Sequence, residues 1–106
     1  MNSTETLARE MGERIAARRK ELGLSQEKLS EKSNVSIHTI SSAERGIKCL
    51  RADSIIKVSA ALNVSADYLL TGLISDADYD RLVERLKNTT DEKRKEILQI
   101  IDILLK

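Results

Sequence analysis

The chain has 106 residues, the length of one ordinary domain, and its hydrophobic fraction of 41% is enough for a core. Trp, Phe and Pro are absent and 33% of the residues are charged, so the composition favours a soluble, helical protein with an aliphatic core. The formal net charge of +1 excludes a strong overall attraction to nucleic acid. Any anion-binding surface must therefore come from the local placement of charge.

The sequence also argues against several kinds of site. Cys49 is the only cysteine and His38 the only histidine, so we expect no disulfide framework, no metal and no cofactor. No nucleophile elbow accompanies the Ser, His and Asp residues, so we expect no catalytic residues and no enzymatic activity. Neither a signal peptide nor an apolar run of about 18 residues is present, which predicts a cytoplasmic protein.

The first predicted helix covers roughly residues 5–22 and ends at Gly23, because glycine readily adopts the left-handed conformation that follows a helix. Its inward stripe recurs at helical spacing and consists of Met11, Ile15, Arg19 and Leu22. The stripe is unusual because it places one charged residue, Arg19, among apolar ones.

The next two helices are joined by a sharp turn. Ser25 caps the first of them, and Leu29 faces inward. Asn34 follows, and asparagine tolerates the left-handed conformation that a tight turn needs. Ser36 caps the second helix and Gly46 ends it. Helical spacing places three residues on the buried side of this second helix: Ile40, Ala43 and Glu44.

Two more helices complete a five-helix unit. The fourth has a predicted inward stripe made of Ala52, Ile55, Ile56, Ser59 and Leu62. The fifth is short, begins after the cap Ser65 and ends at Gly72.

Residues 73–106 differ in kind from this unit. An amphipathic helix is predicted behind Ser75, and its apolar residues are Tyr79, Leu82, Val83 and Leu86. A break at residues 88–90 precedes the final helix, for which Thr89 and Glu92 form a predicted capping box. The apolar face of the final helix is too broad for a lone surface helix and contains Ile97, Leu98, Ile100, Ile101, Leu104 and Leu105. This helix either folds back on the five-helix unit or pairs with a copy of itself.

The segment from Gln26 to Arg45 has the 20-residue pattern of a helix-turn-helix. Its fifth position is a small residue, Ser30, and its ninth is the turn-former Asn34. Apolar residues occupy the fourth, tenth and fifteenth positions: Leu29, Val35 and Ile40. The small residue lets the two helices approach, and the apolar residues lock them together. The second helix then projects as a rigid rod that fits the major groove of B-DNA, which is about 12 Å wide.

From about Met11 to Gly72 the chain resembles the xenobiotic-response-element family of lambda-repressor/Cro-like helix-turn-helix domains. The stretches that carry the resemblance are "GLSQ", "TIS" with "ERG", and "ALNVS" with "DYLLTG". The resemblance implies an all-α fold, with a five-helix DNA-binding domain over residues 1–72. We expect the two amphipathic helices over residues 73–106 to form a dimerisation segment.

The resemblance also implies which residues contact DNA. Gln26 would donate a hydrogen bond to a phosphate, and Lys48 and Arg51 would contact the backbone from the loop after the third helix. The residues that would approach phosphates and base edges are Ser36, Ile37, His38, Thr39, Ser41 and Ser42. Ile37 is a candidate for contact with a thymine methyl group. Arg45 has two interpretations, either a phosphate contact or a cation that stabilises the helix C-terminus.

The family usually contains an internal ion pair between its first and third helices, which here would join Arg19 to Glu44. This pair would explain two charged residues on buried stripes, since each is expensive to bury alone. Arg18 departs from the family because it stands where a core leucine is common. The loop residues Ile47, Cys49 and Leu50 replace residues that are frequently basic, proline or polar, so the loop has lost phosphate-binding charge.

We therefore predict a sequence-specific regulator of transcription that binds double-stranded DNA, most simply a homodimeric repressor associated with the nucleoid. Its operator would be pseudo-palindromic, and the residues predicted to dimerise are Ile97, Ile101, Leu104 and Leu105. The rival interpretation is an antitoxin or adaptor whose main partner is a protein. The nearly neutral net charge and the less basic loop favour this rival.

Overall fold

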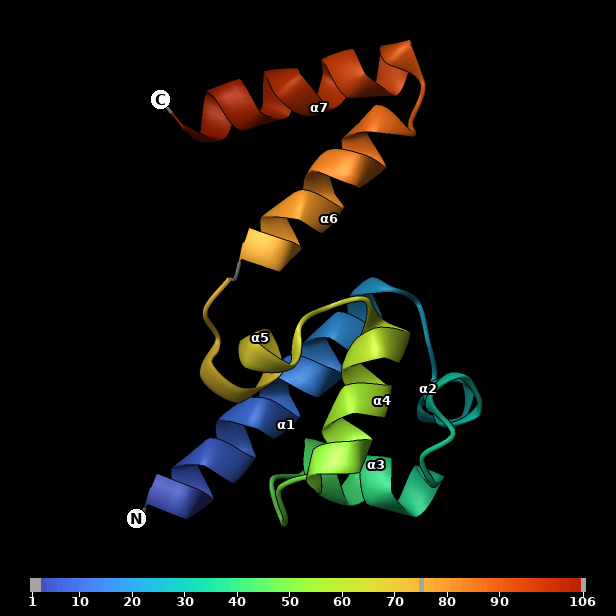
Figure 1. Ribbon diagram of the computed structural model, residues 1–106, viewed down its shortest axis with the longest axis vertical. Helices are drawn as coiled ribbons and strands as arrows, with labels where there is room; N and C mark the ends of the chain where they lie inside the picture. The colour runs from blue at the N-terminus through green and yellow to red at the C-terminus, as the bar shows by residue number, and fades with distance from the viewer. Residues whose placement is uncertain (1–2, 75, 106) are drawn as a thin grey trace. The chain divides into compact units, whose positions relative to one another are not determined.

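The computed structural model describes residues 3–74 and 76–105, and every regular element within them is a helix. The chain divides into two compact units, Met1–Ser75 and Asp76–Lys106 (Figure 1). The fold of the described residues is all-α, as predicted. None of their helices combines the length and the apolar character that a membrane crossing requires.

The described part of the first unit contains five short helices. They are α1 (Ser3–Glu21), α2 (Gln26–Ser33), α3 (Ile37–Glu44), α4 (Ala52–Leu62) and α5 (Ala66–Thr71). The predicted N-caps of α2, α3 and α5 are confirmed, because a hydroxyl group accepts a backbone N–H hydrogen bond at each; the caps are Ser25, Ser36 and Ser65. The turn at Asn34 is also confirmed, since its φ of 57° is left-handed.

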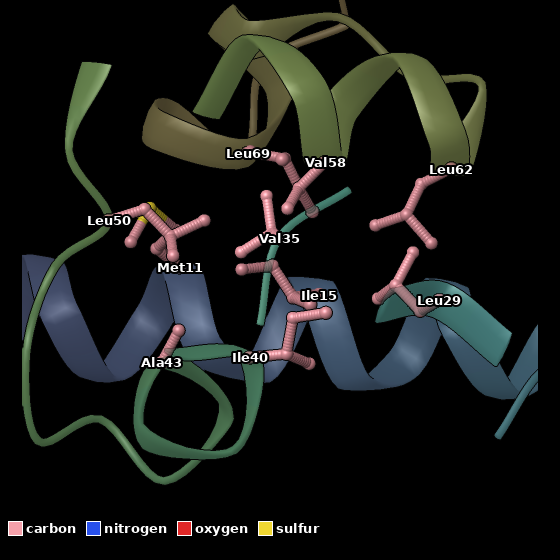
Figure 2. Close-up of a cluster of buried hydrophobic side chains, with 10 residues drawn as sticks. All are labelled: Met11, Ile15, Leu29, Val35, Ile40, Ala43, Leu50, Val58, Leu62 and Leu69. Atoms are coloured by element: carbon pink, nitrogen blue, oxygen red, sulfur yellow. The ribbon is translucent and has the colours of Figure 1, made fainter. Parts of the chain in front are cut away.

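One hydrophobic core holds these five helices together (Figure 2). It consists of Met11, Ile15, Leu29, Val35, Ile40, Ala43, Leu50, Val58, Leu62 and Leu69. Figure 2 shows the side chains of α4 and α5 pointing toward those of α1, α2 and α3. Most of these residues lie on the stripes that helical spacing predicts, so the pattern of apolar residues locates most of the core.

The stripe predicted for α4 is wrong at two of its five residues and misses one buried residue. Ile56 is 66% exposed and Ala52 is also exposed, whereas Val58 is completely buried. The face that meets the core is instead formed by Ile55, Val58, Ser59 and Leu62. Because α4 packs against both α2 and α5, these neighbours select its inward face. Leu22, predicted on the stripe of the first helix, lies beyond the end of α1 and is exposed.

Two arginines of α1 bind the C-terminal ends of other helices. Arg14 Nη1 donates a hydrogen bond of 3.0 Å to the carbonyl oxygen of Leu69 in α5. Arg18 Nε donates one of 3.0 Å to the carbonyl oxygen of Leu62, the last residue of α4. A cation is favourable at these places because the last carbonyl groups of a helix lack partners and carry partial negative charge. Arg18 therefore has a structural role in place of the leucine common in the family.

The expected ion pair between Arg19 and Glu44 is present and connects α1 to the end of α3. Arg19 Nε and Nη2 donate hydrogen bonds of 2.8 and 2.9 Å to the two carboxylate oxygens, and Nη1 donates one of 2.9 Å to the carbonyl oxygen of Leu24. The side chains of the pair are only 13% and 5% exposed.

The hydrogen bond to Glu44 raises the pKa of Arg19 above its ordinary value, although burial acts in the opposite direction. A raised pKa in the folded state means that the charged guanidinium stabilises the fold at every pH below the ordinary arginine pKa. This contribution is lost only as the pH rises into stronger alkali. Arg19 therefore keeps its positive charge, and can pair with Glu44, throughout the neutral pH range.

A glycine permits α1 and α3 to pack closely. A Cβ atom at Gly12 would overlap the carbonyl oxygen of Ala43 and would lie 3.0 Å from that of Glu44. Both oxygens belong to the backbone of α3, so a side chain at this position requires the two helices to move apart. The sequence does not distinguish Gly12, because a glycine within a helical pattern carries no local sign of what it contacts.

The second unit is a pair of helices, α6 (Asp76–Lys87) and α7 (Asp91–Leu104). Arg94 of α7 fixes the connection between them. Its guanidinium donates hydrogen bonds of 2.9, 3.0 and 3.0 Å to the carbonyl oxygens of Leu86, Lys87 and Thr89. An arginine again supplies donors to the end of a helix, here from the first turn of the next one.

The capping box predicted at Thr89 is wrong by one residue. Thr90 is the N-cap of α7, and its hydroxyl accepts a hydrogen bond of 3.2 Å from the N–H of Lys93. Thr89 belongs to the connection, where its carbonyl group accepts from Arg94. The third residue after Thr90 is a lysine, so no acidic side chain completes a capping box. Ser75, which precedes the first helix predicted for this unit, lies outside the described residues.

Apolar side chains of α6 and α7 are exposed. No described side chain between residues 76 and 105 is buried. The large exposed residues are Tyr79, Leu82, Val83, Leu98, Ile100, Ile103, Leu104 and Leu105. Among the residues predicted to dimerise, Ile97 and Ile101 are half-buried, whereas Leu104 is 75% exposed.

Replacing Gly12 with alanine tests the close packing of α1 on α3. Alanine is the better helix former by about 1 kcal/mol, but the overlap with the Ala43 carbonyl is expected to cost about 1–3 kcal/mol beyond that gain. The free energy of unfolding, measured by urea denaturation, should therefore fall for Gly12→Ala. Ala17→Gly, at an exposed position of the same helix, is the control and should lose about 1 kcal/mol from helix propensity. A more stable Gly12→Ala variant would contradict the packing.

Removing Arg19 tests the buried ion pair. Arg19→Met leaves the Glu44 carboxylate buried without its partner, which is expected to cost about 3–5 kcal/mol in the free energy of unfolding. The double variant Arg19→Met with Glu44→Leu leaves no unpaired charge and should recover most of that loss. Chemical denaturation of the three proteins measures both effects. An unchanged unfolding midpoint for Arg19→Met would show that the pair does not contribute.

Candidate nucleic-acid interface

The packing of α3 leaves one face of this helix outward. Ile40 and Ala43 lie in the core, while the hydroxyl of Ser36 fixes the start of the helix. His38 is exposed and Ser42 is half-buried. Helical spacing places both of them on the side of α3 opposite Ile40. The helix is therefore a rigid element that presents polar side chains.

A hollow of about 580 Å³ lies between this face of α3, the loop that follows it and the first turn of α4. Its walls are formed by His38, Thr39, Ser42, Arg45, Ile47, Lys48, Cys49, Leu50, Arg51 and Ser54. Six of the ten residues predicted to contact DNA therefore share one concave surface. Ser54 was not predicted, because a serine in the first turn of a helix is a common feature with many uses.

Positive charge around the hollow comes from three side chains. Lys48 is exposed, and Arg51 is exposed with its guanidinium 3.8 Å from the carboxylate of Asp53. An ion pair so open to water contributes little, so Arg51 keeps its capacity to bind an anion. Arg45 Nε donates a hydrogen bond of 3.3 Å to the carbonyl oxygen of Ser41. Arg45 thus caps the end of α3 while its side chain lines the hollow.

The loop between Gly46 and Arg51 has one apolar residue in the core and others that are half-buried or exposed. Leu50 lies in the core, which ties the loop to the rest of the unit. Cys49 is half-buried, whereas Ile47 is 59% exposed at the wall of the hollow. Leu50, one of the apolar residues that replace polar or basic ones in this loop, therefore holds the loop in position.

Ser36 and Thr39 form a linked pair of hydroxyl groups at the start of α3. Ser36 Oγ accepts a hydrogen bond of 3.1 Å from the N–H of Thr39 and donates one of 2.7 Å to Thr39 Oγ1. The hydroxyl hydrogen of Ser36 is therefore already used within the cap. The hydroxyl hydrogen of Thr39 is not used in this contact, and Thr39 is one of the residues that line the hollow.

The remaining predicted residues lie outside the hollow. Ile37 is 48% exposed, and Ser41 is half-buried on the flank of α3. Gln26, the first residue of α2, is half-buried and its Nε2 donates a hydrogen bond of 3.1 Å to Glu44 Oε1. The side chain predicted to bind a phosphate thus joins the buried ion pair of Glu44 with Arg19, an arrangement that spacing alone does not predict.

Two curated proteins are similar to parts of this chain. Repressor protein C2 of Salmonella phage P22 is 41% identical over 68 residues, which are 64% of this chain and 32% of the phage protein. The HTH-type transcriptional regulator ImmR of Bacillus subtilis (strain 168) is 35% identical over 60 residues, 57% of this chain and 47% of ImmR. The chain thus covers about a third of one curated relative and about half of the other.

Two solved structures resemble the fold. One is the P22 c2 repressor in complex with the synthetic operator 9T, with a TM-score of 0.57, 43% identity and coverage of 59% of this chain and 96% of that chain. The other is the SinR/SinI protein complex, with a TM-score of 0.57, 31% identity and coverage of 87% and 94%. The family model for Helix-turn-helix (HTH_3) matches residues 15–69, more than half of the sequence, so the chain belongs to this helix-turn-helix family.

Proposed function

We propose that this protein is a transcriptional repressor that binds a specific sequence in double-stranded DNA with α3 in the major groove. The observation that carries this proposal is the surface around the hollow, where six predicted DNA-contacting residues from the outward side of α3 and the loop after it meet. The comparisons support it, because the chain is similar to the P22 repressor, and one structure of that repressor is a complex with a synthetic operator. Such a protein would work on the nucleoid, in the cytoplasm.

The residues of the interface would divide their work by chemistry. His38 and Ser42 lie at the centre of the outward face and would hydrogen-bond base edges, which supplies specificity of about 1–3 kcal/mol for each good contact. Ile37 would pack against a thymine methyl group from the flank of α3, and Ser41 lies on the same flank. Thr39 would donate its free hydroxyl hydrogen to a phosphate.

Phosphate contacts would fix the register of α3 without reading sequence. Gln26 would supply one such contact from α2, and Lys48 and Arg51 would supply others from the loop. Arg45 and Ser36, at the two ends of α3, would also approach phosphates. Few cations surround the hollow, so only a small number of phosphates would be neutralised. The affinity for DNA should accordingly fall only gently as the salt concentration rises.

We also propose that the repressor is a homodimer joined through the second unit. The exposed apolar residues of α6 and α7 would be covered in a dimer, since patches of this kind on a protein surface mark interaction sites. A dimer would set two copies of α3 about 34–36 Å apart, the spacing of two half-sites on one face of B-DNA.

The apolar surface of the second unit also supports a second candidate function, binding to a different protein. The SinR/SinI complex is a structure of two proteins together, and its similar chain matches this one over 87% of the sequence. An antitoxin or adaptor would use the same face of α6 and α7 for its partner. The hollow on the first unit is the feature that favours DNA over this alternative.

In vitro selection from a random duplex library tests DNA binding and the division of roles. The unaltered protein should enrich a pseudo-palindrome, and Gln26→Ala should bind all sequences more weakly by a similar factor. His38→Ala should instead lose preference at one position in each half-site, because it removes a base contact. Uniform losses for both variants would contradict these roles. A library that shows no enrichment at low salt would overturn the repressor and leave the protein-binding function.

A charged substitution in α7 tests the dimer. Leu104 shares a helix face with Ile97 and Ile101, so Leu104→Glu should convert a dimer into a monomer in sedimentation equilibrium and weaken operator binding. Gln99→Glu is the matched control, because Gln99 is also exposed but lies on the side of α7 opposite Ile97, Ile101 and Leu104. A full-length protein that is monomeric before any substitution would refute the homodimer.

A further inference from the structure

A chain of three side chains links the interior of the first unit to the start of α2. Arg19 binds both carboxylate oxygens of Glu44, and Glu44 Oε1 also accepts the hydrogen bond of 3.1 Å from Gln26 Nε2. The three residues come from α1, α3 and α2, respectively. The same carboxylate therefore completes a buried ion pair and binds the residue proposed to contact a DNA phosphate.

We infer that Glu44 is a positioning residue for DNA binding, which holds the Gln26 amide so that its second N–H is directed to a phosphate. This inference rests on the proposed function, since it names how one phosphate contact is prepared. Glu44 itself touches no DNA in this arrangement. It acts through Gln26, and it couples the contact made by α2 to the position of α3.

The hydrogen-bonding chemistry determines which way the amide of Gln26 points. A carboxylate can only accept hydrogen bonds, so the atom of Gln26 that faces Glu44 must be the nitrogen and not the oxygen. That nitrogen carries two hydrogens, and Glu44 uses one of them. A phosphate also only accepts, so it can use the second hydrogen but would repel the amide oxygen. Binding to Glu44 thus excludes the flipped, unproductive orientation.

The ion pair makes this arrangement electrostatically acceptable. An unpaired carboxylate beside a phosphate would repel it, and the repulsion would be large because a buried charge is poorly screened by water. Arg19 lies 2.8 Å from the carboxylate of Glu44 and neutralises it. The side chain of Glu44 is only 5% exposed and accepts two hydrogen bonds from the guanidinium, so it is also fixed in place.

A double-mutant cycle on operator binding tests the coupling. The reference background is the unaltered chain, and the second background is Arg19→Met with Glu44→Leu, which removes the anchor without leaving a buried charge unpaired. Gln26→Ala should weaken operator binding about ten-fold in the unaltered chain. In the second background it should cost about two-fold or less, because the amide has already lost its fixed orientation.

Lys48→Ala is the matched control in the same cycle. Lys48 lines the hollow and is also proposed to bind a phosphate, but it belongs to the loop after α3. Its loss should lower affinity by the same factor in both backgrounds, since the effects of independent sites add. An equal cost of Gln26→Ala in both backgrounds would overturn the role of Glu44 and leave the repressor intact. An unaltered protein that binds no DNA would instead refute the proposed function.

A measurement on the unaltered full-length chain keeps the inference testable if the double variant fails to fold. Nuclear magnetic resonance resolves the two side-chain amide protons of Gln26 separately. The proton bound to Glu44 should exchange with water at least several-fold more slowly than the other, and addition of operator should then slow the second. Equal exchange of both protons in the free protein would overturn the inference.

Discussion

The contact between α1 and α3 is the constraint on which the rest of the first unit depends. Gly12 lets the backbones of the two helices approach, and two turns later Arg19 reaches Glu44. A buried charge is tolerated only with a partner at hydrogen-bonding distance, so the pair can form in one register of the two helices. The other buried side chains of α3 are apolar and tolerate small shifts between the helices more easily. The charged contact is therefore the one that selects the register of α3 against α1.

The outward surface of α3 follows from this inward constraint. Once Glu44 and Ile40 face α1 and the core, helical geometry turns His38 and Ser42 outward. Leu50 then anchors the following loop in the core, which brings Lys48 beside α3. The resulting surface contains few charges, so selective hydrogen bonds rather than overall electrostatic attraction would determine where the protein binds.

Arginines recur in this structure as links to the ends of helices. Arg14 and Arg18 bind the carbonyl groups at the ends of α5 and α4, and Arg94 binds those at the end of α6. A planar guanidinium has five donors and can satisfy several carbonyl groups that a helix leaves without partners. In a chain with little aromatic surface, these contacts complement the aliphatic core and set the angles at which short helices meet.

The sequence by itself determined the features that depend on neighbouring residues: the helices, the serine caps, the left-handed turn at Asn34 and most of the core stripes. The resemblance to the family implied the pairing of Arg19 with Glu44, and helical spacing placed both residues on buried stripes. Only the tertiary structure decided the inward face of α4 and the hollow itself. It likewise decided the contact between Gln26 and Glu44. Caps and turns involve residues within about four positions of each other, so local patterns record them. The other features join residues far apart in the chain, and their partners are known only once the helices have packed.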